Sequence, residues 1–139
     1  MMTTETPDLA RAAEVITLTD SVVGKGIRQL ALSGGPDEHQ QLAYDLAHSA
    51  SAVEMARSML DYGAKGNAEG LLTCAFVADM LHEVISRVVG REQQWGLAAN
   101  PLGTAHDFLV KFRDPQFVAS LAKTQGPRHL EDEFEMVQD

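Results

Sequence analysis

Two long helical segments, separated by only a short break, constrain this chain more than any other feature of its sequence. Residues 42–66 read LAYDLAHSASAVEMARSMLDYGAKG, and residues 71–90 form a second apolar segment. Apolar side chains that recur at alternating spacings of three and four lie on one side of an α-helix. The spacing therefore predicts two amphipathic helices, and the short connection predicts that they pack antiparallel.

The first of these segments has two adjacent stripes, which are typical of an inner helix that touches neighbours on more than one side. One stripe consists of Leu42, Leu46, Ser49, Val53, Ala56 and Leu60, and the other of Asp45, His48, Ala52, Met55, Met59 and Tyr62. In the second segment, we expect the main buried stripe to consist of Leu71, Ala75, Ala78, His82, Ile85 and Val89.

Another long helix precedes them. Thr6 is a suitable N-cap, and Pro7 suits a first turn because its missing N–H has no partner there. The breaker cluster 33–36, Ser-Gly-Gly-Pro, predicts the end of this helix. The expected stripe consists of Leu9, Ala12, Ile16, Thr19, Val23, Gly26 and Leu30.

The remaining boundaries come from capping residues. We expect the helix that contains residues 42–66 to begin near Asp37, and Asn67 to cap the following helix. Asn100-Pro101 and Asp114-Pro115 each place a capping residue before a first-turn proline, and so predict two short helices. The predicted fold is all-α: an antiparallel helical bundle of three long helices plus two short C-terminal helices.

Composition agrees with one helical domain. The 139 residues are 45% hydrophobic but only 6% aromatic, so that Ala, Leu, Val and Met supply most of the apolar mass and favour helices. We expect residues 1–125 to form the bundle. Gly126-Pro127 ends it, and residues 126–139 read as a linker and the start of a following helix.

Charge and hydropathy exclude several classes of partner. A net charge of −9 argues against nucleic acid and against anionic membrane surfaces. The longest apolar run, residues 71–78, is too short to cross a bilayer, and the N-terminus lacks an export signal. We therefore expect a cytoplasmic protein. Cys74 is the only cysteine, which excludes an internal disulfide and favours a small core residue.

The sharpest candidate for chemistry is a pair of Asp-x-x-His motifs, Asp45/His48 and Asp79/His82. On antiparallel neighbours, His48 lies level with His82, so four ligands converge on one metal ion in this hypothesis. Bundle sites of this kind use the longer Glu and two further carboxylate helices, which this chain does not offer. The alternative is that these side chains pair at the edge of the core or face water.

The order of residues in the first long segment resembles the C-terminal helical bundle of the flavin-dependent acyl-CoA dehydrogenase family. More particularly, the chain is similar to the N-terminal helical extension of a subgroup that includes methylsuccinyl-CoA dehydrogenase, where a linker like residues 126–130 leads into the first core helix. The matching positions are Leu42-Ala43, Asp45-Leu46, Glu54, Ala56-Arg57 and Leu60, then Ala75, Ala78-Asp79 and Val84.

The departures from that family decide what the resemblance implies. Where the family has a glycine-rich run against its FAD, this chain has Val89-Gly90-Arg91-Glu92, and the catalytic glutamate has no counterpart. The resemblance therefore implies no catalytic, cofactor-binding or metal residue here. It implies a non-catalytic packing domain whose partner, in cis or in trans, is an acyl-CoA dehydrogenase core that holds FAD.

Three hypotheses follow from the sequence. The chain is an assembly domain of an acyl-CoA dehydrogenase, a free-standing bundle with metal at Asp45, His48, Asp79 and His82, or a self-associating helical protein without a ligand. The first predicts an exposed apolar face that needs a partner.

Overall fold

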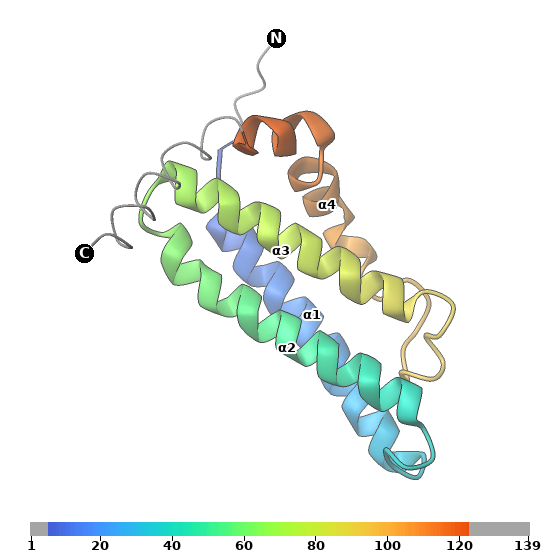
Figure 1. Cartoon of the computed structure of the whole chain (residues 1–139). Helices are drawn as coiled ribbons and strands as arrows, with labels where there is room; N and C mark the ends of the chain where they lie inside the picture. The colour runs from blue at the N-terminus through green and yellow to red at the C-terminus, as the bar shows by residue number, and fades with distance from the viewer. Residues whose placement is uncertain (1–5, 123–139) are drawn as a thin grey trace, which may run out of the picture.

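Three long helices form the body of the molecule, as Figure 1 shows. The computed structural model describes residues 6–122. Helices α1 (Leu9–Leu32), α2 (Gln40–Gly63) and α3 (Asn67–Val88) run antiparallel to their neighbours in sequence. Every regular element within residues 6–122 is helical, so the predicted all-α bundle is confirmed. The predicted boundary after residue 125 lies outside the described residues.

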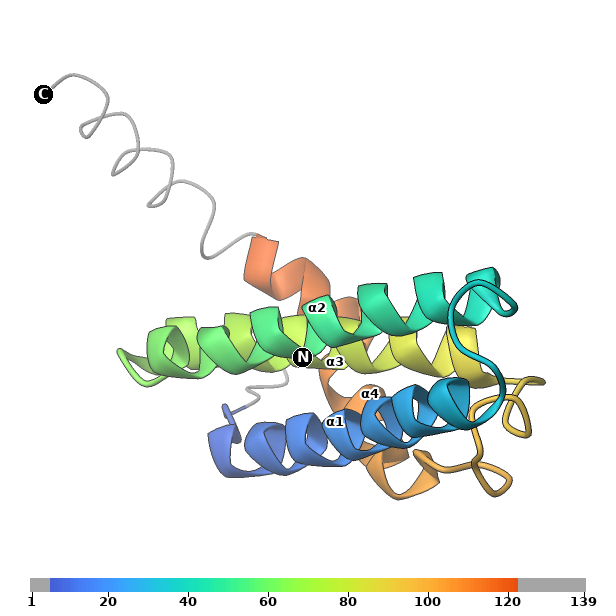
Figure 2. The same cartoon turned by 90° about the horizontal axis from the view of Figure 1, so that it is seen from below.

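The helices pack around α3. Helices α2 and α3 lie side by side, and α1 lies beneath both, as the view from below in Figure 2 shows. After α3 come a loop, the 3₁₀ helix η1 (Gly103–Ala105) and the short helix α4 (His106–Phe112). Helix α4 packs against α3 and α1 on the side of α3 away from α2. A further helical stretch covers residues 115–122.

The predicted core stripes are confirmed in α1 and for the first stripe of α2, except that Leu9 and Leu60 are only half-buried. In both helices, side chains spaced by three and four residues are buried because α1 and α2 each present one side to the rest of the bundle. The buried residues of the two stripes are Ala12, Ile16, Thr19, Val23, Gly26 and Leu30 in α1, and Leu42, Leu46, Ser49, Val53 and Ala56 in α2.

The predicted stripe of α3 is wrong. Of its members only Ala78 is buried, while His82 and Val89 are exposed. The helix has apolar residues on most of its circumference, so more than one row has the required spacing. Contacts with α1, α2 and α4 select a different row. This row consists of Thr73, Cys74, Val77, Leu81, Val84 and Val88.

The second stripe of α2 is not covered as predicted. Only Asp45 in it is buried, and 58% of Met55 is exposed. His48 is exposed as well, and Ala52, Met59 and Tyr62 are half-buried. The inner helix of this bundle is therefore α3, whereas α2 lies at its edge.

Helix ends differ from prediction where a neighbouring residue makes the cap. Asp8, and not Thr6, caps α1, because its Oδ1 accepts a hydrogen bond from the backbone N of Arg11 at 3.0 Å. Helix α2 begins at Gln40 instead of near Asp37. Asn67 is the first residue of α3 and does not cap it. The predicted end of α1 is confirmed: Gly34 and Gly35 have φ values of 115° and 89°.

Of the two predicted short helices, one begins at its predicted capping residue and the other does not. Asp114 caps residues 115–122, since its Oδ2 accepts a hydrogen bond from the backbone N of Phe117 at 3.0 Å. Asn100 instead takes the left-handed conformation, with φ 54°, and makes a turn. Regular α-helix therefore begins only at His106, after η1.

Gly26 allows the closest approach of α1 to the loop that follows α3. A Cβ placed on Gly26 would lie 2.5 Å from Leu46 Cδ2 and 2.9 Å from Trp95 Cε3. Trp95 is completely buried, so neither neighbour has free space to move into. A Cβ on Gly24 would meet nothing within 4 Å. Close approach to Leu46 and Trp95 therefore explains why position 26 is a glycine.

Arg11 joins α1 to the C-terminal elements. Its Nη2 donates hydrogen bonds to the carbonyl oxygen of Thr104 at 2.7 Å and to Asp107 Oδ1 at 3.0 Å. Its Nη1 donates to Glu14 Oε2 at 3.0 Å. The guanidinium thus binds a backbone carbonyl of η1 and a carboxylate of α4 at the same time. These hydrogen bonds hold both elements against α1.

We expect Gly26→Ala to lower the free energy of unfolding by about 1–3 kcal/mol, because the added methyl group overpacks a filled site. Gly24→Ala is the matched control. It should raise the free energy by up to about 1 kcal/mol, since alanine favours the helix and meets no neighbour. Urea denaturation measures both. Equal effects of the two substitutions would show that Gly26 is not needed for packing.

Asp107 makes stability depend on acid pH. The hydrogen bond from Arg11 lowers the pKa of Asp107 below its ordinary value of 3.8. The resulting stabilisation is present above that value and is lost as the pH falls through the lower, folded-state pKa. Asp107→Asn should lower the free energy of unfolding at pH 7 by less than about 1 kcal/mol, because the pair is exposed. Denaturation from pH 7 to 2 should show the difference from wild type shrinking below pH 3.8; a constant difference contradicts the assignment.

Candidate functional site

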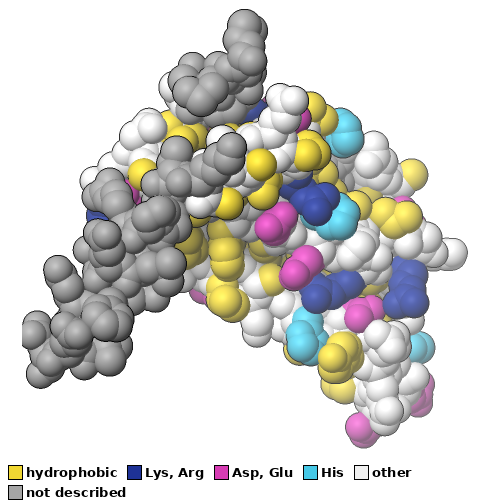
Figure 3. All heavy atoms as spheres, turned by 45° about the horizontal axis from the view of Figure 1, so that its top comes forward, with side chains coloured by type: hydrophobic (Ala, Val, Ile, Leu, Met, Phe, Trp, Pro, Cys, Tyr) yellow, Lys and Arg dark blue, Asp and Glu magenta, His cyan; other side chains and the backbone are white. Residues whose placement is uncertain are grey.

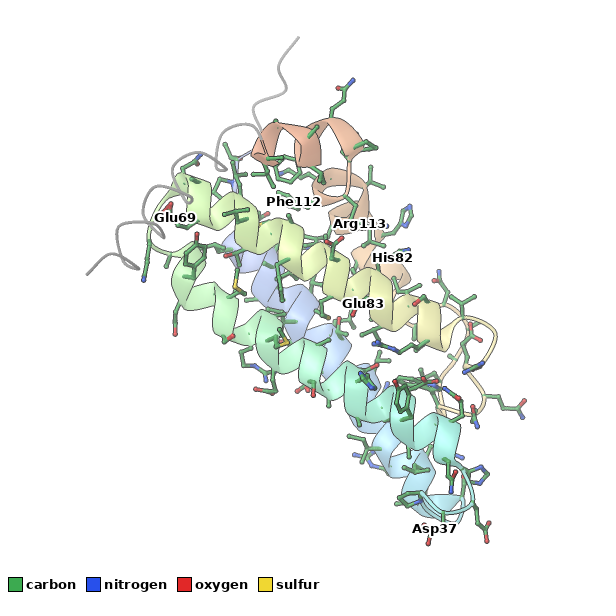
Figure 4. All side chains as sticks on the ribbon, in the orientation of Figure 1. Asp37, Glu69, His82, Glu83, Phe112 and Arg113 are labelled. Carbon is green, nitrogen blue, oxygen red and sulfur yellow. The ribbon has the colours of Figure 1, made fainter. Side chains whose placement is uncertain are left out.

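The four residues of the predicted metal site do not converge. Asp45 is buried toward α3, whereas His48, Asp79 and His82 are exposed. Figure 4 shows His82 on the outer side of α3, near Arg113. Arg113 Nε donates a hydrogen bond to Asp79 Oδ1 at 3.1 Å. Within residues 6–122 no three His, Cys, Asp or Glu side chains gather closely enough to hold a metal ion. The metal hypothesis is therefore wrong for these residues.

The error concerns rotation about the helix axis. Reflection about the α2–α3 turn places residues at equal heights, but it does not say which side of each helix carries them. The row of α3 that contains Asp79 and His82 faces away from α2. His48 instead stacks on Tyr44, with ring centroids 4.2 Å apart.

A polar seam, defined by Asp45 and Ser49 of α2 with Arg87 and Arg91, joins α2 to the end of α3. Arg91 Nη1 donates a hydrogen bond to Asp45 Oδ2 at 3.1 Å, and Arg87 Nη1 donates to Ser49 Oγ at 3.3 Å. Gln41 Nε2 donates to the other oxygen of Asp45 at 3.0 Å. Both oxygens of this buried carboxylate therefore have partners. The seam thus joins the two helices by a charged and a neutral hydrogen bond, and Arg87 Nη2 also lies 4.0 Å from Glu83 Oε2 of its own helix.

Cys74 is a core residue, as its sequence context indicates. The side chain is fully buried, and the backbone N of Asp8 donates a hydrogen bond to its Sγ at 3.4 Å. Burial raises the pKa of the thiol above its ordinary value of 9.0. The thiolate that nucleophilic chemistry requires is therefore disfavoured at this position.

A small hollow lies between the end of α3 and the loop that follows it. Its volume is about 140 Å³, and Ile85, Val88, Glu92, Pro101 and Leu102 are among its lining residues. Pockets for cofactors and drug-sized ligands are usually about 300–1,000 Å³. This hollow is too small for a flavin.

A further surface feature is a partly exposed apolar face shared by α2 and α3. We define the α2–α3 apolar face as Ala52, Met55, Met59 and Tyr62 of α2 with Leu72 and Phe76 of α3. Thr73 Oγ1 donates a hydrogen bond to the carbonyl oxygen of Met59 at 3.1 Å, which places the two rows side by side. Met55 is 58% exposed and the other members are half-buried.

Charged side chains flank the part of this face that α2 supplies. Between Ser51 and Tyr62 the exposed residues of α2 include Glu54, Arg57 and Asp61 as well as Met55. Figure 3 shows hydrophobic side chains gathered on one part of the surface, with acidic and basic side chains concentrated beside them. Large contiguous patches of exposed apolar surface are typical of interaction sites. The α2 residues of this face belong to the second stripe that the sequence shows. We expected other helices of the bundle to cover that stripe.

Comparison of the chain with protein-family models, with curated proteins and with solved structures found no match. The resemblance to acyl-CoA dehydrogenases thus remains a prediction from the quoted residues. Among the helices of residues 6–122, none combines the length and the hydropathy required to cross a membrane.

Loss of Arg91 should destabilise the protein more than loss of an exposed arginine. We expect Arg91→Ala to lower the free energy of unfolding by about 2–3 kcal/mol, because a buried carboxylate then lacks its charged partner. Asp45→Asn should cost about 1 kcal/mol, since Arg91 is half-exposed and water can solvate it. The matched control is Arg113→Ala, whose exposed pair with Asp79 is worth at most about 1 kcal/mol.

Urea denaturation of the three variants tests this order. A cost for Arg91→Ala no larger than that for Arg113→Ala would show that the seam does not hold α2 to α3.

Proposed function

We propose that this chain is the non-catalytic N-terminal helical domain of a cytoplasmic, FAD-dependent acyl-CoA dehydrogenase. The parent enzyme oxidises acyl-CoA thioesters to enoyl-CoA, and its core holds the FAD and the catalytic base. The chain serves assembly: its helices give the core a rigid body to pack against. The resemblance of residues 42–66 to the bundle of that family suggests which enzyme this is.

One observation carries the proposal, namely the α2–α3 apolar face. Four of its six members, Ala52, Met55, Met59 and Tyr62, belong to the same stretch that carries the resemblance. Apolar surface stabilises a complex by roughly 25 cal/mol for each Å² removed from water. An assembly domain needs such a face, and the bundle leaves this one open. The acyl-CoA dehydrogenase core is the partner that we assign to it.

The rigid character of the bundle supports the same role. Helix α3 is buried by contacts with α1, α2 and α4, and the hydrogen bonds of the polar seam hold α2 against it. The open face therefore has a defined shape before any partner arrives. Preorganised surfaces bind with a smaller loss of conformational entropy than mobile ones.

Mixing experiments with a purified, FAD-loaded acyl-CoA dehydrogenase core from the source organism test the proposal. Sedimentation velocity should show the chain moving with the yellow flavin absorbance at the mass of a complex. By itself the chain should be colourless and should not oxidise an acyl-CoA thioester. Met55→Glu should weaken the complex at least tenfold, which corresponds to about 1.4 kcal/mol, because it buries a charge in the face.

Glu54→Gln is the matched control for this experiment. Glu54 is exposed, neighbours Met55 and points to another side of α2, so the substitution should leave the complex unchanged. Three results contradict the proposal: flavin retained by the purified chain, thioester oxidation by the chain alone, or a chain that forms dimers but ignores the core. The last result identifies a self-associating helical protein.

A further inference from the structure

The hollow at the end of α3 has an apolar floor. Of the residues that line it, Val88 and Leu102 are buried and form its deepest part. Ile85 and Pro101 are half-buried, whereas Val89 is 65% exposed and lies at the outer edge. The hollow is therefore open to solvent on one side and dry at its base.

The opposite wall is held by its own backbone. The loop after α3 turns back beside the end of that helix (Figure 1). In this loop Asn100 takes the left-handed conformation, and its carbonyl oxygen accepts a hydrogen bond from the backbone N of Gly103 at 3.2 Å. The carbonyl oxygen of Leu102 accepts one from the backbone N of Ala105 at 3.1 Å. The hollow thus exists before any ligand arrives, which lowers the entropic cost of binding.

Glu92 supplies the only charge among the residues that line the hollow. Its side chain is half-buried, and within residues 6–122 it has no hydrogen bond or ion pair. The two nearby arginines are turned towards α2, since Arg87 donates to Ser49 and Arg91 donates to Asp45. A carboxylate that is partly withdrawn from water and lacks a partner is stabilised by a cation placed beside it.

Two further features favour positive charge at this place. The hollow lies at the C-terminal end of α3, where the helix dipole presents partial negative charge. The whole chain also has a net charge of −9, which raises the local concentration of cations around it. Each effect acts in the same direction as Glu92.

We propose that this hollow binds a small primary amine, whose apolar group occupies the floor and whose ammonium group pairs with Glu92. This binding site is separate from the α2–α3 apolar face. It does not depend on the acyl-CoA dehydrogenase proposal.

Volume limits the apolar group of this amine. The hollow measures about 140 Å³. An apolar cavity of about 150 Å³ accepts benzene, so a phenyl ring or a branched alkyl group of similar size fits here. A ligand of this size buries little surface, and its dissociation constant should be on the order of millimolar.

The order of the groups distinguishes a free amine from a lysine side chain. Val88 and Leu102 are buried deeper than Glu92, so the part of the ligand that enters first must be apolar. A lysine side chain would enter with its ammonium group first and would bring a charge to the dry floor, which is costly. In an amine such as benzylamine the ring enters first and the charge stays at the edge.

Methyl NMR of the purified chain, titrated with benzylamine at pH 7, tests the proposal. Shifts should be confined to the methyl groups of Ile85, Val88, Val89 and Leu102, and benzyl alcohol is the uncharged ligand of matching shape. Glu92→Gln should weaken benzylamine about fivefold, the upper range for a partly exposed ion pair, and leave benzyl alcohol unchanged.

Glu83→Gln is the matched control, because it changes the net charge equally. Glu83 is exposed on α3 outside the hollow, as Figure 4 shows, so this substitution should leave both ligands unchanged. Val89→Trp should block both ligands by filling the outer edge. Since Val89 is exposed, that variant should keep the far-UV circular dichroism of the wild type.

Three results overturn the proposal. One is the absence of saturable shifts at the hollow, and another is an equal effect of Glu92→Gln on benzylamine and benzyl alcohol. The third is a peptide with an N-terminal phenylalanine that binds at least tenfold more tightly than benzylamine, because the hollow then serves a polypeptide and not a small molecule. None of these measurements uses a flavoenzyme, so failure here is distinguishable from failure of the proposed function.

Discussion

Burial of α3 among three neighbours is the interaction on which the rest of the structure depends. Val77, Leu81 and Val84 are fully buried, and α1, α2 and α4 all pack against this helix. Because apolar burial supplies most of the favourable free energy of folding, α3 is the element that the other helices must cover. Helix α2 can then cover only one side of α3, and its own outer side stays open. The α2–α3 apolar face is thus a direct consequence of which helix occupies the centre.

Directional contacts determine how the helices are placed around that centre. Arg11 bonds to η1 and α4, and Arg91 bonds to Asp45 of α2, so that each arginine joins segments far apart in sequence. Gly26 leaves the space that the buried ring of Trp95 occupies. Hydrophobic burial alone tolerates several arrangements of similar helices, whereas hydrogen bonds and steric fit do not. These contacts therefore favour one register, and they give the open face a defined shape.

The proposed function concerns the α2–α3 apolar face. Exposed apolar surface is a liability in water, since it invites association with similar surfaces. A flavoenzyme core that covers this face would remove the liability and would be held against a rigid support. The acidic remainder of the surface keeps other contacts weak.

The spacing of apolar residues in the sequence determined the helices themselves, the buried stripe of α1 and the first stripe of α2. Residues three and four apart lie on one side of a helix, so the sequence alone shows which side is apolar. It did not determine which row of α3 is buried, since Leu, Ala and Val occur on most sides of that helix and only its neighbours select among them. For the same reason His48 and His82 were placed at one height but point to different sides. The open state of Met55 and Met59 was likewise decided by tertiary structure: an apolar stripe shows that a side chain favours burial, and only the arrangement of neighbours shows whether anything in the bundle covers it.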